Sequence, residues 1–177
     1  MMKALALTCI LALALGLQAQ TENEPSKHEA APEDVASPDA ILKAAYDVIS
    51  GPAGKRRDWD RLRSLCVPEV HFIVVTKPGS ADPVASYDLN AFIDAAQKAL
   101  EKEGFYERSV ANRVERWDRI AHVFSTYESR HNADDPKPFE RGINSFQLAN
   151  DGKRWWIVNI FWERERPEAP IPKKYLK

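Results

Sequence analysis

The spacing of apolar residues changes along the chain, from a helical period in the first half to a strand-like period in the second. Two strand-like runs, residues 141–148 and 154–162, are separated by Asp151-Gly152. An Asp-Gly pair between such runs is a strong signal for a β-hairpin. The second run is apolar at both parities, so both of its faces need to be covered. Residues 105–132 predict two further strands that turn near residues 116–119.

Three segments of the first half show the helical spacing, and each begins at a residue that caps helices well. The predicted caps are Ser37, Asp58 and Asp88. The third helix is the clearest, because its apolar residues form one stripe before Gly104 ends it. One strand, residues 70–75, follows the second helix. Helices gathered early and strands gathered late favour an α+β fold in which a curved antiparallel sheet wraps around a long helix.

The N-terminal part of the chain carries two other patterns. Residues 1–19 have a basic start, an apolar core and a small residue at the expected cleavage point, which predicts a cleavable signal peptide and export to the periplasm or the medium. That apolar run is too short to span a membrane and no later run is longer, so we expect no integral membrane segment. Residues 20–36 are acidic and contain few large apolar side chains, which predicts a flexible tether. Residues 37–176 then have the length of a single domain.

Charge and motif content exclude several classes of partner. The formal net charge is −1, and basic residues are mixed with acidic ones throughout, so nucleic acid is not an expected partner. The histidines lack the spacing of metal ligands, and the chain has neither a glycine-rich phosphate loop nor a nucleophile elbow. We therefore expect no metal and no cofactor. Cys66 is expected to be a buried, unreactive side chain.

The order of elements, together with the sequences of residues 121–128, 141–148 and 154–158, resembles the nuclear transport factor 2-like (NTF2-like) superfamily, and most of all its bacterial SnoaL-like members. The resemblance implies a cone, in which helices close the concave face of a strongly bent sheet around an apolar pocket with a few polar groups. Members include ketosteroid isomerase, scytalone dehydratase, polyketide cyclases and non-enzymatic association modules. A shared fold of this kind leaves the function open.

Two side chains are candidates for catalysis in such a pocket. His71, between the apolar residues Val70 and Phe72, could act as a base if the strand turns it into the pocket. Its alternative role is that of a hydrogen-bonded structural histidine. Tyr127 could donate its hydroxyl to a ligand carbonyl, and its alternative is a core position with the hydroxyl in water. His122 is a weaker candidate, because charged neighbours suggest a solvated edge.

Candidate ligand contacts come from the last three strands. Asn144 and Gln147 lie on opposite faces of one strand, so both cannot face a single cavity without a bulge. On the last strand, the face of Trp155 and Asn159 is expected to line the pocket. A buried amide without a partner costs about 1–3 kcal/mol, so an inward amide needs a neighbour or a ligand. The predicted pocket contacts are Ser125, Ser145, Gln147, Trp155 and Asn159.

The opposite face of the last strand, which includes Trp156, is apolar and needs a cover. A second copy of the chain is the expected cover, which predicts a homodimer through the outer sheet face. The alternative is that the N-terminal tail or residues 167–176 lie across the sheet.

Three functions follow from these predictions. The first is an exported domain that binds a small apolar molecule. The second is an isomerase or dehydratase that moves a proton in a small apolar carbonyl compound. The third is a homodimerising scaffold whose pocket is filled by its own aromatic side chains.

Overall fold

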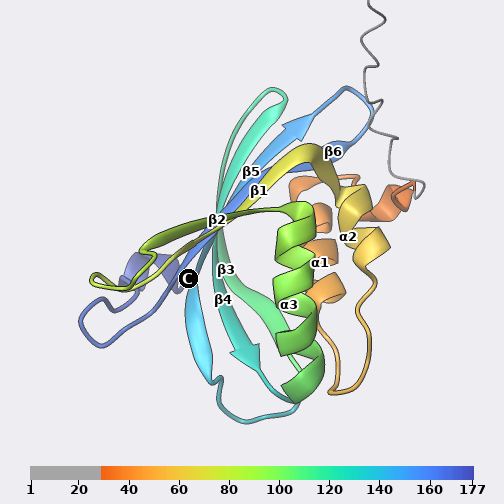
Figure 1. The fold of residues 1–177 in the computed structure, drawn as a ribbon. Helices are drawn as coiled ribbons and strands as arrows, with labels where there is room; N and C mark the ends of the chain where they lie inside the picture. The colour runs from red at the N-terminus through yellow and green to blue at the C-terminus, as the bar shows by residue number, and fades with distance from the viewer. Residues whose placement is uncertain (1–28) are drawn as a thin grey trace, which may run out of the picture.

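The computed structural model describes residues 29–177, so the predicted signal peptide and residues 20–28 of the predicted tether lie outside the described residues. Strands in the order β2-β1-β6-β5-β4-β3 form a single bent sheet, and the helices lie against its concave face (Figure 1). This is the predicted α+β cone. The elements are η1 (Pro32–Asp34), α1 (Pro38–Ile49), α2 (Trp59–Leu65), β1 (Cys66–Val75), β2 (Val84–Asp88), α3 (Leu89–Glu103), β3 (Tyr106–Trp117), β4 (Ile120–Arg130), β5 (Glu140–Asn150), β6 (Trp155–Arg164) and η2 (Lys173–Tyr175).

The three predicted helix caps are confirmed. The side chains of Ser37, Asp58 and Asp88 each accept a hydrogen bond from the backbone N–H three residues later, which satisfies one of the free donors of the first turn. Gly104 ends α3 with a φ of 70°, a conformation that glycine adopts without steric cost. No helix within residues 29–177 is long and apolar enough to cross a membrane.

The sheet differs from the prediction in two ways. β2 is an additional short strand, which pairs with β1 only from His71 to Val75. The pairing of β1 with β6 is parallel, whereas every other pairing is antiparallel. The parallel pairing follows from the chain order, because α3 and the four strands β2 to β5 separate the two partners and carry the chain back to the same end.

A bulge in β6 changes which of its side chains face the core. Val158 has no partner on β5, because Ile157 pairs with Leu148 while Asn159 pairs with Gln147. An extra residue of this kind reverses the alternation of inward and outward side chains along a strand. The two halves of β6 therefore present opposite parities to the core.

Part of the predicted tether is ordered against the domain. Ala30 and Val35 are buried, and the carboxylate of Asp34 accepts hydrogen bonds of 2.7 Å and 2.7 Å from Arg61. This arginine holds the pKa of Asp34 below its ordinary value. The Val35 carbonyl also accepts a hydrogen bond from the N–H of Trp155. The prediction of a tether up to residue 36 is therefore wrong for residues 29–36, because a few contacts to an existing surface order a segment that has no core of its own.

The C-terminal segment lies across the outer face of the sheet, as one of the two alternatives proposed for that face. The Tyr175 carbonyl accepts a hydrogen bond of 2.5 Å from Thr126, and the Tyr175 ring packs against Phe124 at 5.0 Å. Val158 and Phe161 stay exposed on β6 beyond this cover. The C-terminal segment leaves a smaller apolar surface on the outer face for a second copy of the chain. The homodimer stays a prediction.

Gly142 allows β5 to pass closely behind the Tyr127 side chain. A Cβ at this position would lie against the Glu163 carbonyl oxygen and 2.5 Å from the Tyr127 hydroxyl. We expect Gly142→Ala to lower the free energy of unfolding by roughly 1–3 kcal/mol, as overpacking usually does. Urea denaturation followed by circular dichroism measures this loss. Adding Tyr127→Phe removes the hydroxyl but keeps the ring carbon Cε1, 2.7 Å from the added Cβ, so it should restore only part of the stability. An unchanged unfolding free energy for Gly142→Ala would contradict the prediction.

Candidate functional site

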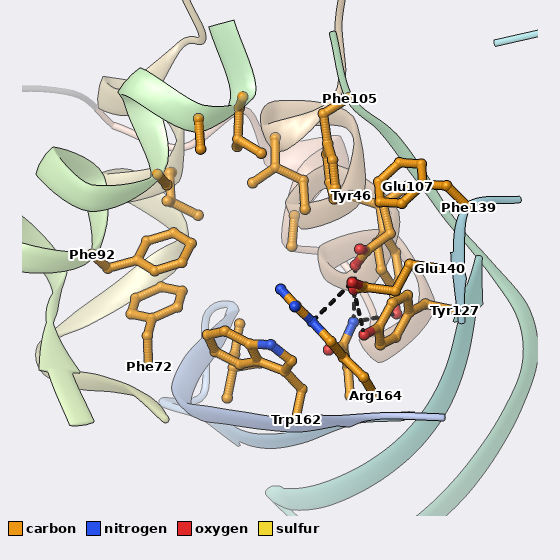
Figure 2. A pocket seen from close by; sticks show the side chains of 18 of the residues that line it. Tyr46, Phe72, Phe92, Phe105, Glu107, Tyr127, Phe139, Glu140, Trp162 and Arg164 are labelled. Atoms are coloured by element: carbon orange, nitrogen blue, oxygen red, sulfur yellow. Dashed lines mark hydrogen bonds and ion pairs between the residues drawn. The ribbon is translucent and has the colours of Figure 1, made fainter. Parts of the chain in front are cut away.

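A cavity of about 370 Å³ lies between the concave face of the sheet and the helices α1 and α3 (Figure 2). At the roughly 30 Å³ that a water molecule occupies in the liquid, it has room for roughly twelve non-hydrogen atoms. The scaffold alternative required a pocket filled by the protein's own side chains, and this space is open instead. The lining residues from α1 and α3 are mainly small or apolar, whereas the strands contribute both aromatic and ionisable side chains.

One wall of the cavity is aromatic. The Phe72 and Phe92 rings, from β1 and α3, stack with their centroids 4.1 Å apart, and Trp162 on β6 meets Phe92 edge to face at 6.3 Å (Figure 2). A wall of this kind offers a flat apolar contact surface to a ligand.

The opposite wall carries a buried carboxyl group, that of Glu107 on β3. Its Oε1 accepts a hydrogen bond of 3.0 Å from Asn144, and its Oε2 accepts one of 2.8 Å from Ser129. Burial of the carboxyl raises the pKa of Glu107 to about 7, although both hydrogen bonds lower it. Glu107 is therefore present in both protonation states near neutral pH.

Asn144 joins this carboxyl to a second group in the wall. Its amide also donates a hydrogen bond of 3.2 Å to the hydroxyl of Tyr46 on α1, which lies 2.7 Å from the Ser125 hydroxyl. Burial and the charge of Glu107 raise the pKa of Tyr46, so its hydroxyl stays neutral and can act as a donor. Hydrogen bonds thus connect α1 to the three strands β3, β4 and β5 at the wall that holds Glu107.

A second carboxyl, Glu140 at the start of β5, is fully paired. Its Oε1 accepts a hydrogen bond of 3.0 Å from Tyr127, and its Oε2 lies 2.8 Å from the Nε of Arg164 (Figure 2). Burial and, after it, the charge of Glu140 raise the pKa of Tyr127, so this hydroxyl remains a neutral donor.

His71, the predicted base, does not reach the cavity. Its side chain is exposed, and its Nδ1 lies 3.3 Å from the Ser86 hydroxyl on β2, while the neighbouring Phe72 lines the cavity. The prediction is wrong because β1 is apolar at both parities, so the sequence did not indicate which face turns inward. His122 also lies outside the cavity, with its Nε2 2.8 Å from the Ser145 hydroxyl.

Of the two residues predicted on β4, Tyr127 lines the cavity and Ser125 does not. The Tyr127 hydroxyl is bound to Glu140, so neither predicted role, a donor to a ligand or a hydroxyl in water, describes it. Ser125 is fully buried one layer behind the cavity lining, where it contacts Tyr46.

The remaining predicted contacts, Ser145, Gln147, Trp155 and Asn159, do not line the cavity. On β5 it is the face of Asn144 that turns inward, so Ser145 faces a second cavity on the outer side. On β6 the bulge at Val158 brings Ile160 and Trp162 into the cavity in place of Asn159. Trp155 is buried beyond the cavity, with Arg116 over its ring at 4.9 Å.

Sequence reasoning missed the ionisable groups Glu107, Glu140 and Arg164. One signal could have found the first: Glu107 shares a strand parity with Ser109, and the strand begins directly after the glycine that ends the long helix. Such a position lies where helix and sheet meet. Glu140 and Arg164 lie at strand ends among other charged residues, and no local pattern distinguishes them.

Neither a protein-family model nor a curated protein sequence matches the chain. Solved structures do match. An NTF2-like protein of unknown function from Silicibacter pomeroyi DSS-3 has a TM-score of 0.52 and 14% identity, over 73% of this chain and 94% of that one. A candidate calcium/calmodulin-dependent protein kinase type II association domain from Thiobacillus denitrificans ATCC 25259 has a TM-score of 0.56 and 13% identity, over 73% and 96% of the two chains.

A protein of unknown function with a cystatin-like fold, from Nostoc punctiforme PCC 73102, has a TM-score of 0.54 and 11% identity, over 73% of this chain and 91% of that one. The chain has the NTF2-like fold. Identities this low show a shared fold alone, so the activity of this protein has to be inferred from its own side chains. Among residues 29–177, no group of three or more His, Cys, Asp or Glu side chains is placed to hold a metal ion.

The raised pKa of Glu107 makes the stability of this domain depend on pH. The unfolded carboxyl ionises at its ordinary pKa of about 4.5, whereas the folded one keeps its proton up to about pH 7. Wild-type stability therefore falls as pH rises through this window. Glu107→Gln, which cannot ionise, should match wild type near pH 5 and exceed it near pH 8 by up to about 3 kcal/mol in the free energy of unfolding.

Urea denaturation at the two pH values measures this difference. Glu115→Gln, which neutralises an exposed carboxyl on the same strand, is the matched control. A stability gain for Glu107→Gln that is equal at pH 5 and pH 8 would show that the buried carboxyl does not titrate between them.

Proposed function

We propose that this protein binds a small, largely apolar carbonyl compound in its main cavity and moves a proton next to the carbonyl group, with Glu107 as the base. The observation that supports the proposal most strongly is the position of Glu107, a buried carboxyl with a pKa of about 7 on the wall of an apolar cavity. A general base is most effective when its pKa is close to the working pH, because it must both accept a proton and return it.

Such a reaction also needs a donor for the negative charge that develops on the carbonyl oxygen. Tyr46 supplies it in this proposal. Its hydroxyl lies on the same wall as Glu107, is positioned by Asn144 and Ser125, and stays neutral because burial raises its pKa. Both tyrosine hydroxyls already donate a hydrogen bond, Tyr46 to Ser125, whose own proton goes to Ser109, and Tyr127 to Glu140. Tyr46 is better suited, because a developing oxyanion can replace the neutral Ser125 hydroxyl as the acceptor more readily than it can replace the Glu140 carboxylate.

Isomerisation requires one group that takes a proton from one carbon and returns it to another, and Glu107 is sufficient for this. Dehydration requires in addition an acid that protonates the leaving hydroxyl. Besides Glu107, the cavity lining includes an imidazole, that of His131, whose ring stacks on Phe139 and whose Nδ1 lies 3.4 Å from the Gly104 carbonyl oxygen. Isomerisation is the proposed reaction, because Glu107 is sufficient for it without a second acid. The signal-peptide pattern of residues 1–19 supports the further proposal that the reaction takes place outside the cytoplasm.

The exchange of the acidic protons of 2-tetralone tests the proposal. This flat ketone has roughly as many non-hydrogen atoms as the cavity can hold. We expect wild-type protein to accelerate deuterium incorporation next to the carbonyl, at a rate that rises with pH through about 7 as Glu107 ionises. Glu107→Gln should reduce the protein-catalysed rate by about a hundredfold or more. Proton NMR in deuterated water follows the exchange.

His71→Ala is the matched control, because it removes a titratable side chain outside the cavity and should keep the wild-type rate. The proposal is wrong if folded Glu107→Gln exchanges 2-tetralone as fast as wild type, or if His71→Ala is the variant that loses exchange.

A further inference from the structure

Among residues 29–177, Arg164 is the one arginine or lysine that lines the main cavity, and only part of its guanidinium group is paired. The guanidinium of Arg164 has five N–H donors in a rigid fork, and its Nε faces Glu140 at 2.8 Å. Figure 2 shows that the other end of the group points away from Glu140, into the space between the aromatic wall and the carboxyl wall. Within residues 29–177, neither terminal nitrogen of Arg164 donates a hydrogen bond to another side chain.

We propose that the terminal nitrogens of Arg164 bind a carboxylate of the substrate, so that the substrate is an apolar carbonyl compound that also carries a carboxylate group. The carbonyl half of this statement rests on the proposed function, whereas the carboxylate half rests on Arg164 alone.

The pairing with Glu140 prepares the arginine for this task. A guanidinium binds a carboxylate through two parallel hydrogen bonds, either at its side or at its end. Glu140 holds Arg164 at Nε, which leaves the two terminal nitrogens free for a bidentate contact at the end. Because that ion pair already restricts the long side chain, binding a ligand costs less conformational entropy.

The charge of Arg164 could either stabilise an oxyanion or bind an ionised carboxylate, and the exposure of its side chain favours the second role. The side chain of Arg164 is 63% exposed, compared with 20% for Glu140. A group that stabilises an oxyanion works best where water is excluded, because water weakens its field. A permanently ionised carboxylate belongs where water still reaches it. The geometry thus places the ligand's carboxylate at the mouth and its apolar body inside, against Phe72 and Phe92.

Three carboxyl groups of the described residues also line the cavity and would repel an anionic ligand. The negative charge of each is reduced or partly compensated by its surroundings. Glu140 is paired with Arg164 and accepts a hydrogen bond from Tyr127. Glu107 is partly protonated near neutral pH. Glu103 is exposed at the rim, where its carboxylate lies 3.8 Å from Lys102. An acidic lining would nevertheless attract a cationic ligand, so the test includes a cationic probe.

The test compares three probes that share one apolar body and differ in their head group: 4-phenylbutanoate, 4-phenylbutanamide and 4-phenylbutylamine. Isothermal titration calorimetry at pH 7 measures their affinities for the full protein. We expect wild type to bind the carboxylate roughly tenfold or more tightly than the amide. Arg164→Met should weaken carboxylate binding by roughly ten- to a hundredfold and leave amide binding unchanged.

Arg141→Met is the matched control, because Arg141 forms a similar ion pair with Glu165 but does not line the cavity. It should bind all three probes as wild type does. Should Arg164→Met fail to fold, Arg164→Lys, which keeps the charge and loses the fork, should show an intermediate loss for the carboxylate. Equal affinities of wild type for carboxylate and amide, tighter binding of the amine, or no binding of the carboxylate would each overturn the inference.

These measurements need no turnover, so they separate the inference from the proposed function. A carboxylate preference without 2-tetralone exchange would support the role of Arg164 and reject Glu107 as a base. Exchange of 2-tetralone without a carboxylate preference would reject only the role of Arg164.

Discussion

The burial of the Glu107 carboxyl is the constraint on which the candidate site depends. Moving a carboxylate out of water is costly, and two hydrogen-bond donors, Asn144 and Ser129, recover only part of that cost. What remains is a group that titrates near pH 7 and not in the acid range. The same arrangement requires Asn144 to face inward, which fixes the face that β5 turns to the cavity and connects the carboxyl to Tyr46 on α1.

The cavity separates its functions between two walls. Phe72 and Phe92 on one wall, with Trp162 beside them, offer contact area without charge. The other wall holds every ionisable group that the proposals use, and each carboxyl on it has a different partner. Glu107 has only neutral donors, whereas Glu140 has a cation. Neighbouring carboxyl groups with unlike surroundings can take unlike roles, one as a proton carrier and the other as a fixed support.

Local signals in the sequence predicted the fold well, and the site poorly. The caps at Ser37, Asp58 and Asp88 and the Asp-Gly turn depend on a few adjacent residues, so they could be read directly. The orientation of a strand depends on its neighbours. His71 was misplaced because β1 is apolar on both faces, and Asn159 was misplaced because nothing near Val158 in the sequence marks a bulge. The carboxyl pair was missed because its members come from separate strands.

Because β6 has one unpaired residue, the side chains that line the cavity depend on the number of residues in this strand as well as on their identity. Val158 itself faces solvent, and its side chain contributes little to the lining. Its presence nevertheless shifts the whole end of the strand by one position, which turns Trp162 and Arg164 inward. Relatives that differ by one residue at this point would therefore present another set of side chains to a ligand, even if every aligned residue were the same.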